Sequence, residues 1–187
     1  MIISELALPG VFLITPDIHS DDRGFFLENW NVRRYIEAGF PDVRFVQSNH
    51  SQSRRGVLRG MHFQLRNPQG KLLQVIRGAV LDVAVDLRVG SPTFGGWVAE
   101  ELNESLHRQL YVPPGFAHGF CALTDCADLV YLCTSVYDAA SDGGVVWNDP
   151  EIGIDWPISR PILSARDKGL PTLRQARDAG LLPSVTA

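Results

Sequence analysis

Apolar and polar residues alternate along the middle of this chain, in short runs that turn-forming residues separate. The clearest run, LDVAVDLR at residues 81–88, has apolar residues at its four odd-numbered positions and two Asp and an Arg among the others. A period of two is typical of a β-strand with one face against a core. Similar runs predict strands at residues 25–30, 44–50, 57–64, 71–76, 97–102, 109–112, 119–123 and 129–136.

Two segments favour short helices instead. Asn31 can be the N-cap of a helix at residues 32–38, and Thr172 can be the N-cap of a helix at residues 173–179. A glycine directly follows each segment, as is common after the last turn of a helix. About nine strands with two short helices indicate a mainly β fold, a sandwich or barrel whose interior can hold a small ligand.

Length and charge narrow the class of protein. With 187 residues, of which 45% are hydrophobic and 20% charged, the chain is expected to form one globular domain over residues 1–187. The sequence does not indicate whether the tail from about residue 181 is ordered. Lys and Arg number 17 against 21 Asp and Glu, a net charge of -4 that argues against a nucleic-acid polymer as partner.

The ends of the chain and its cysteines bear on location. The first residues lack the basic and apolar regions of a signal peptide, and no window approaches the length of a membrane-spanning helix, so we expect no membrane partner. Cys121, Cys126 and Cys133 are odd in number and form no CxxC pair. A disulfide framework or zinc site is therefore not expected, and reduced thiols predict a cytoplasmic protein.

Two stretches carry histidines that could do chemistry. His62 shares a strand face with Gly60, whose missing side chain leaves room for a ligand, although a lone histidine is more often structural. His118 ends a PxGxxH stretch that resembles the second signature of the cupin superfamily, in which this histidine can bind a metal. Metal sites need three or four protein ligands, and position 64 is Gln where metal cupins have a second His. We therefore expect no metal.

Longer stretches carry a more specific resemblance. They are residues 22–26, 45–49, 56–64, 71–75, 82–88, 91–95, 113–120, 147–150 and 163–168, with Gly78, Tyr131 and Tyr137. Together they resemble the dTDP-4-dehydrorhamnose 3,5-epimerase family over most of residues 10–170. The resemblance implies a cupin-type jelly-roll barrel that works as a homodimer without a cofactor. It also implies inversion of C3 and C5 of dTDP-4-dehydro-6-deoxy-D-glucose, which yields dTDP-4-dehydro-L-rhamnose in dTDP-L-rhamnose biosynthesis.

The resemblance also implies roles for single residues. Each inversion removes a proton beside a keto group, passes through an enolate and returns a proton to the other face. His62 would be the base, and Asp167 the carboxylate that orients it. Tyr131 would be the acid on the opposite face, and Lys71 the charge near the keto oxygen. The matched positions expected to bind the sugar nucleotide are Arg23, Glu28, Gln47, Asn49, Arg59, His118, Tyr137, Asp142 and Lys168.

Spacing supports some of these positions and questions others. Gln47 and Asn49 are two apart and share a strand face, and an unbroken strand would also put Tyr131 and Tyr137 on one face. Arg59 and His62 are three apart, so a regular strand sends them to opposite faces. Either a bulge at Gly60 redirects one of them, or one serves a site of the partner subunit.

One departure from the family and three alternative functions remain. At residue 142 the family usually carries Glu, and here it is Asp, one methylene shorter. An epimerase of a related dTDP-4-keto-deoxysugar that inverts a single carbon would use the same four catalytic residues. A metal-dependent cupin enzyme and a catalytically silent module that binds sugar nucleotides are the more distant alternatives.

Overall fold

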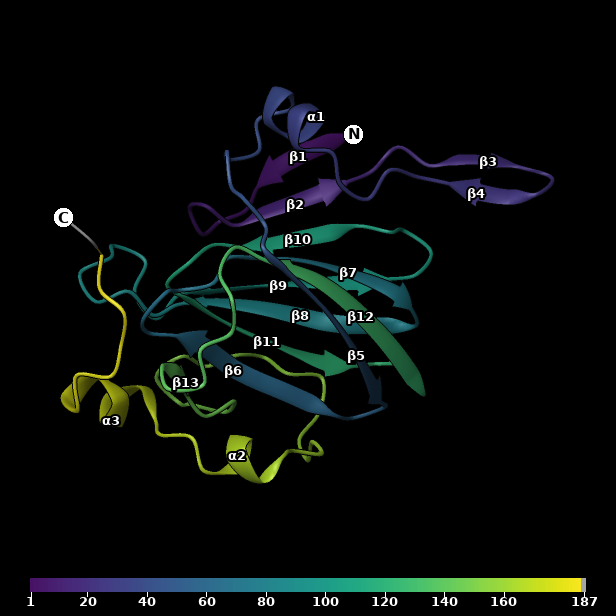
Figure 1. Cartoon of the computed structure of the whole chain (residues 1–187). Helices are drawn as coiled ribbons and strands as arrows, with labels where there is room; N and C mark the ends of the chain where they lie inside the picture. Colours follow the sequence, from purple (N-terminus) through teal and green to yellow (C-terminus); the bar gives the residue numbers. More distant parts are fainter. Residues whose placement is uncertain (186–187) are drawn as a thin grey trace.

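Two antiparallel sheets lie against each other, and the main core fills the space between them (Figure 1). The computed structural model describes residues 1–185. Its strand order is β1-β2-β10-β7-β12-β5 in the six-stranded sheet and β13-β6-β11-β8-β9 in the five-stranded sheet. The predicted mainly β, cupin-type architecture is confirmed. Among the described residues no helix is long and apolar enough to cross a membrane.

The elements that form these layers come from distant parts of the chain. The six-stranded sheet consists of β1 (Ile2–Glu5), β2 (Phe12–Thr15), β10 (Gln109–Val112), β7 (Lys71–Arg77), β12 (Cys126–Cys133) and β5 (Gln47–Arg54). The five-stranded sheet consists of β13 (Asp142–Gly144), β6 (Leu58–Gln64), β11 (Phe116–Ala122), β8 (Ala79–Asp86) and β9 (Trp97–Asn103). A separate hairpin of β3 (His19–Asp21) and β4 (Gly24–Phe26) projects away from both sheets (Figure 1). The helices are α1 (Val32–Glu37), α2 (Ala165–Lys168) and α3 (Leu173–Asp178).

Most predicted elements correspond to observed ones, and the differences have local causes. The predicted strand at residues 25–30 is wrong beyond Phe26, because the chain leaves the hairpin there and Trp30 packs on Tyr35 of α1, with 4.5 Å between ring centroids. The strand predicted at residues 129–136 ends at Cys133. The strands β1, β2, β3 and β13 and the short helix α2 were not predicted, and each of them has only three or four residues.

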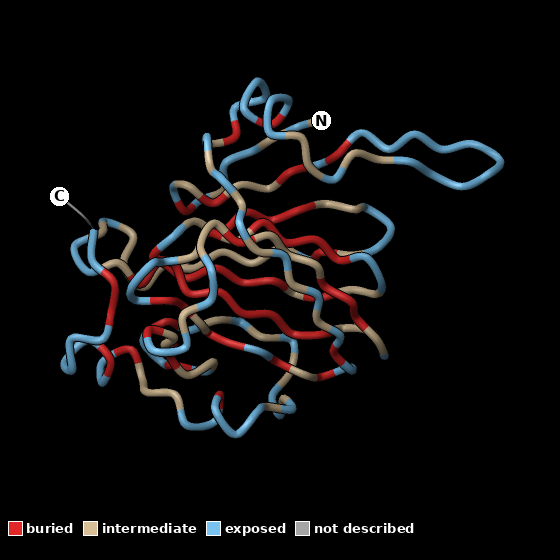
Figure 2. The backbone as a smooth tube through the Cα atoms, viewed as in Figure 1, coloured by how far each residue is buried: buried red, intermediate tan, exposed pale blue. Residues whose placement is uncertain are grey.

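The alternating strand β8 separates two cores. Val80 and Ala84 belong to the core between the sheets, so the face that carries Asp82 points inward. Val83 and Val85 point to the outer face, where they pack with Leu173 and neighbouring residues of the C-terminal segment. That segment is held by a hydrogen bond from the Val89 amide to the Pro183 carbonyl (2.8 Å) and runs ordered to residue 185, while residues 186–187 lie outside the described part. Figure 2 shows the buried strands at the centre of the molecule.

An extra residue in β6 changes which way its side chains point. His62 is opposite His118 of β11 and Arg59 is opposite Phe120, so three steps along β6 match two along β11. Gly60 supplies the extra residue at φ +131°, and a Cβ atom there would lie 2.6 Å from the Cα atom of Gly119. Of the two explanations that the spacing left open, the structure shows the bulge, and the bulge turns Arg59 and His62 to the same side of the sheet.

Replacing Gly60 should cost more stability than replacing a glycine in open space. Gly60→Ala forces a contact with the β11 backbone as well as an unfavourable φ, and overpacking of this kind costs roughly 1–3 kcal/mol. Gly39 is the matched control, because it also has positive φ (+96°) but nothing lies within 4 Å of an added Cβ. We expect urea unfolding to show a larger loss for Gly60→Ala than for Gly39→Ala. Equal losses would mean that the close approach of β6 and β11 does not constrain the fold.

Candidate active site

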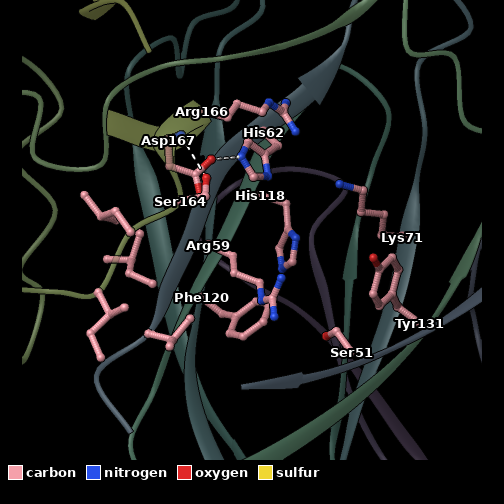
Figure 3. A pocket seen from close by; sticks show the side chains of 14 residues that line it. Ser51, Arg59, His62, Lys71, His118, Phe120, Tyr131, Ser164, Arg166 and Asp167 are labelled. Atoms are coloured by element: carbon pink, nitrogen blue, oxygen red, sulfur yellow. Dashed lines mark hydrogen bonds and ion pairs between the residues drawn. The ribbon is translucent and has the colours of Figure 1, made fainter. Parts of the chain in front are cut away.

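A cavity of about 490 Å³ opens between the sheets and is lined by all four predicted catalytic residues (Figure 3). A second cavity of about 290 Å³ shares His62, Lys71 and Tyr131 with the first. The shared walls make the two cavities parts of one elongated site. The residues that line either cavity and matter below are Gln47, Asn49, Ser51, Arg59, His62, Lys71, His118, Tyr131, Tyr137, Asp142, Ser164, Arg166 and Asp167.

The shortest polar contact in this site joins His62 to Asp167. The Nε2 atom of His62 lies 2.6 Å from Oδ1 of Asp167, a residue 105 positions later in the chain. Asp167 is buried in the first turn of α2, where the N-cap hydroxyl of Ser164 accepts a hydrogen bond from its amide (3.0 Å). Because a carboxylate accepts, Nε2 carries the hydrogen and Nδ1 is left as the basic nitrogen of a neutral ring.

The carboxyl group of Asp167 stays ionised in this setting. Burial by itself would raise its pKa, but the hydrogen bond from His62 and the charge that His62 carries when it is protonated, with smaller contributions from Ser164 and Arg166, hold the pKa below its ordinary value. A carboxylate that remains charged can stabilise an imidazolium on its neighbour. The pair is therefore suited to accept a proton from a ligand in the cavity.

Lys71 and Tyr131 lie on the wall opposite Asp167, on the neighbouring strands β7 and β12 of the other sheet (Figure 3). Burial lowers the pKa of Lys71, although Cys133, Asp142 and Asp82 act in the opposite direction. Burial also raises the pKa of the Tyr131 hydroxyl, so this phenol keeps its proton at neutral pH. A planar ring bound between the sheets would thus face a base on one side and a proton donor on the other.

Cationic groups gather in the same space. Arg59 is fixed by hydrogen bonds from its Nε to the Ser53 hydroxyl and from its Nη2 to the Gln52 carbonyl, each 3.0 Å. Arg166, which we did not predict, lines both cavities and pairs with Asp142 at 2.8 Å. The only signal for it in the sequence was its place directly before Asp167. Together with Lys71, these guanidinium groups make the site suitable for an anionic ligand.

The second cavity contains the predicted pair on β5 and the residue that departs from the family. The Nε2 of Gln47 donates to Oδ1 of Asn49 (3.0 Å), as expected for two residues on one strand face. The hydroxyl of Tyr137 donates to Asp142 (2.8 Å), and its amide donates to Gln47 Oε1 (2.8 Å). Tyr137 lies beyond the end of β12, so the expectation of an unbroken strand from Tyr131 is wrong, although both rings still line this cavity.

Three predicted binding residues lie away from both cavities. Arg23 is on the projecting hairpin, with a side chain that is 89% exposed and pairs with Asp21. Glu28 pairs with Arg34 of α1 (3.1 Å), and Lys168 is exposed at the end of α2. Their own chain gives these three residues no access to the site.

Two further polar residues, Gln64 and Ser51, lie beside the site and were not predicted to take part in it. Gln64 donates to the carbonyls of Asn67 and Val136 and accepts from the Asp138 amide, so it holds two loops together. The buried hydroxyl of Ser51 lines the larger cavity without a hydrogen-bond partner among the described residues.

In the part of the chain that the structure describes, no group of three His, Cys, Asp or Glu side chains could hold a metal.

Comparison with known proteins agrees with this geometry. The family model described as dTDP-4-dehydrorhamnose 3,5-epimerase matches residues 5–175. The dTDP-4-dehydrorhamnose 3,5-epimerase of Pseudomonas aeruginosa is 51% identical over 88% of this chain and 92% of its own. The dTDP-4-dehydrorhamnose 3-epimerase of Streptomyces niveus is 48% identical over 98% of this chain and 89% of its own.

A solved structure extends the similarity to the whole fold. The dTDP-6-deoxy-D-glucose-3,5-epimerase of Legionella pneumophila, in complex with dTDP-4-keto-L-rhamnose, superimposes with a TM-score of 0.93 at 44% identity, covering 99% of this chain and 98% of that one. With the matching family model and relatives near 50% identity, the chain belongs to the dTDP-4-dehydrorhamnose 3,5-epimerase family.

Proposed function

We propose that this protein inverts C3 and C5 of dTDP-4-dehydro-6-deoxy-D-glucose to give dTDP-4-dehydro-L-rhamnose, as a step of dTDP-L-rhamnose biosynthesis. The observation that carries the proposal is the pair His62–Asp167 facing Tyr131 across a cavity. A 4-keto group acidifies the hydrogens on both neighbouring carbons, so one base and one acid on opposite sides can serve both inversions.

In the proposed mechanism His62 takes the proton from C3 or C5 through its Nδ1 atom. Asp167 holds the ring in this orientation through Nε2 and stabilises the imidazolium that forms. The negative charge moves to the C4 oxygen, and the ammonium of Lys71 stabilises the enolate. Tyr131 then returns a proton from the opposite wall, which inverts the carbon.

The remaining polar side chains are proposed to bind the nucleotide part of the substrate. Arg59, His118 and Arg166 surround the larger cavity and can donate to diphosphate oxygens. Tyr137 is half-exposed beside the second cavity, where its ring can stack on the thymine base. Asp142 links Tyr137 to Arg166, so the two contacts would be formed together.

A second candidate is inversion of C3 alone. The observation that favours it is the relative from Streptomyces niveus, which is named a 3-epimerase and shares 48% identity over 98% of this chain. One base, one acid and one cation near the keto oxygen serve either reaction, because each inversion uses the same three functions. The two candidates therefore differ in which carbons exchange protons.

Solvent exchange should distinguish these candidates. When the protein acts on dTDP-4-dehydro-6-deoxy-D-glucose in D₂O, the proposed reaction places deuterium at both C3 and C5, because each proton is replaced from solvent. NMR of the product measures both positions. Deuterium at C3 alone would support the second candidate, and a protein that exchanges neither carbon is not an epimerase of this substrate.

Two substitutions should separate the base from the acid. His62→Ala should abolish both exchange and product while dTDP still binds, because the base acts first. Tyr131→Phe should retain measurable exchange but form product roughly 10²–10⁴-fold more slowly, the usual contribution of a positioned acid. Isotope exchange and product formation are followed in the same reaction. Wild-type turnover in His62→Ala would contradict the mechanism.

We also propose that the protein acts as a homodimer whose β3–β4 hairpin completes the partner's site. The hairpin exposes Phe25 and Phe26 at 59% and 70% and makes few contacts with its own sheets. Burial of these rings against a second copy would be favourable. It would also carry Arg23, which lines neither cavity of the site in its own chain, toward a diphosphate.

Mixed dimers can test this arrangement. A dimer of one Arg23→Ala chain and one His62→Ala chain would hold one intact site, since the barrel of the first meets the hairpin of the second. Random co-assembly of the two weakly active variants should therefore recover about a quarter of wild-type activity. The matched control pairs His62→Ala with Asp167→Ala, both changes in the barrel, and should recover none. Equal activity of the two mixtures would exclude a shared site.

The extent of the domain and its place in the cell are also part of the proposal. The C-terminal segment covers the outer face of β8 and supplies Asp167, which supports residues 1–187 acting as one catalytic domain. The three cysteines form no disulfide among the described residues, which supports a cytoplasmic protein that cell fractionation would locate.

A further inference from the structure

The cavity contains a second histidine–carboxylate pair that the proposed mechanism does not use. The Nε2 atom of His118 lies 2.9 and 3.0 Å from the two carboxylate oxygens of Asp82. Both residues are buried, and Asp82 has no exposed surface. Within residues 1–185, His118 is the only hydrogen-bond partner of the Asp82 carboxylate. A buried carboxylate with one partner is costly for the fold, which indicates a role in the site.

This contact determines which atom of His118 is available to a ligand. Because carboxylate oxygens only accept, Nε2 must carry a hydrogen, and Nδ1 is the ring nitrogen left for the cavity. His118 lines that cavity together with Arg59 and Lys71 (Figure 3). Diphosphate oxygens are acceptors, so a hydrogen bond from Nδ1 to a diphosphate requires a hydrogen on Nδ1 as well. The ring would then be an imidazolium.

The protein groups around His118 disfavour that charge. Burial lowers the pKa of His118, while Asp82 of β8 opposes this effect. The charge of Lys71 of β7, and that of His62 of β6 when it is protonated, lower the pKa further. On β9 the residue paired with Asp82 is Glu100, which has its own partner in Arg108 at 3.6 Å. A bound diphosphate adds negative charge beside the ring and reverses this balance.

We propose that His118 takes up a proton when the sugar nucleotide binds, and that Asp82 is the positioning residue for this uptake. The inference rests on the proposed function, because it needs a nucleoside diphosphate in the cavity. Asp82 fixes the tautomer before binding and supplies the counter-charge of the imidazolium afterwards. The affinity for the nucleoside diphosphate should therefore depend on pH. It rises as the pH falls through the pKa of His118 in the complex, and it levels off below the pKa of His118 in the free protein.

Calorimetry with dTDP as the probe measures the uptake directly. Binding heats at neutral pH in HEPES and in Tris, which differ in ionisation enthalpy and do not compete with a phosphate group, give the number of protons taken up. Wild type should take up a fraction of one proton, and Asp82→Asn should take up almost none. Asp82→Asn should also bind dTDP roughly 3- to 10-fold more weakly near neutral pH and equally at pH 9.

The chain offers a matched control on the outside of the barrel. His50 and Asp128 form a similar pair (3.0 Å), but His50 is exposed. Its side chain points away from the two cavities, of which Asn49 lines one and Ser51 the other. Asp128→Asn should therefore keep wild-type uptake and affinity. Asp167→Asn should keep the uptake too, because it changes the other histidine pair.

Several outcomes would overturn the inference. Unchanged uptake in Asp82→Asn, or loss of uptake in Asp167→Asn alone, would place the proton elsewhere. Should Asp82→Asn not fold, histidine ¹⁵N spectra of the wild type decide: we expect only Nε2 of His118 to be protonated in the free protein and both nitrogens with dTDP. A ring that stays neutral with dTDP contradicts the inference, whereas failure of dTDP to bind the wild type contradicts the proposed function itself.

Discussion

The close approach of β6 and β11 is the constraint on which the site depends. Gly60 and Gly119 lie so near each other that neither could carry a Cβ atom without displacing backbone. The extra residue of β6 at this point turns Arg59 and His62 to one side, and the register then sets His62 opposite His118. A regular strand would place one of the two functional side chains against the outer core. The site is therefore a property of a local irregularity in the barrel.

The interior of the barrel is divided between packing and chemistry. Leucine and valine side chains such as Leu73 and Leu129 fill one part with no exposed surface. The other part holds charged groups, and burying a charge is costly unless it has a partner. Asp82 and Asp167 meet this condition with a histidine each. Two carboxylate–histidine pairs thus lie side by side in the polar part of the interior.

Much of this fold could be read from the sequence, because alternation along strands such as β8 reports a sheet with two different faces. The alternation did not say which face is inside. In β8 the apolar face covers the outer core and the face with Asp82 looks inward, which depends on a C-terminal segment 90 residues away. Sequence spacing likewise could not place Arg166, whose role comes from an ion pair with Asp142. Arg23 and Glu28 matched the family pattern, yet their place on or beside a projecting hairpin follows from tertiary structure alone.

The position of α2 late in the sequence has a consequence for the chain during its synthesis on the ribosome. His62 belongs to the barrel, but its orienting carboxylate arrives 105 residues later, on a four-residue helix that docks beside β6. During synthesis the barrel strands emerge first and can pair while the segment that carries Asp167 is still unmade. A nascent chain at that stage therefore contains His62 without its carboxylate partner. The His62–Asp167 pair forms only after the segment that carries α2 has been made and has docked beside β6.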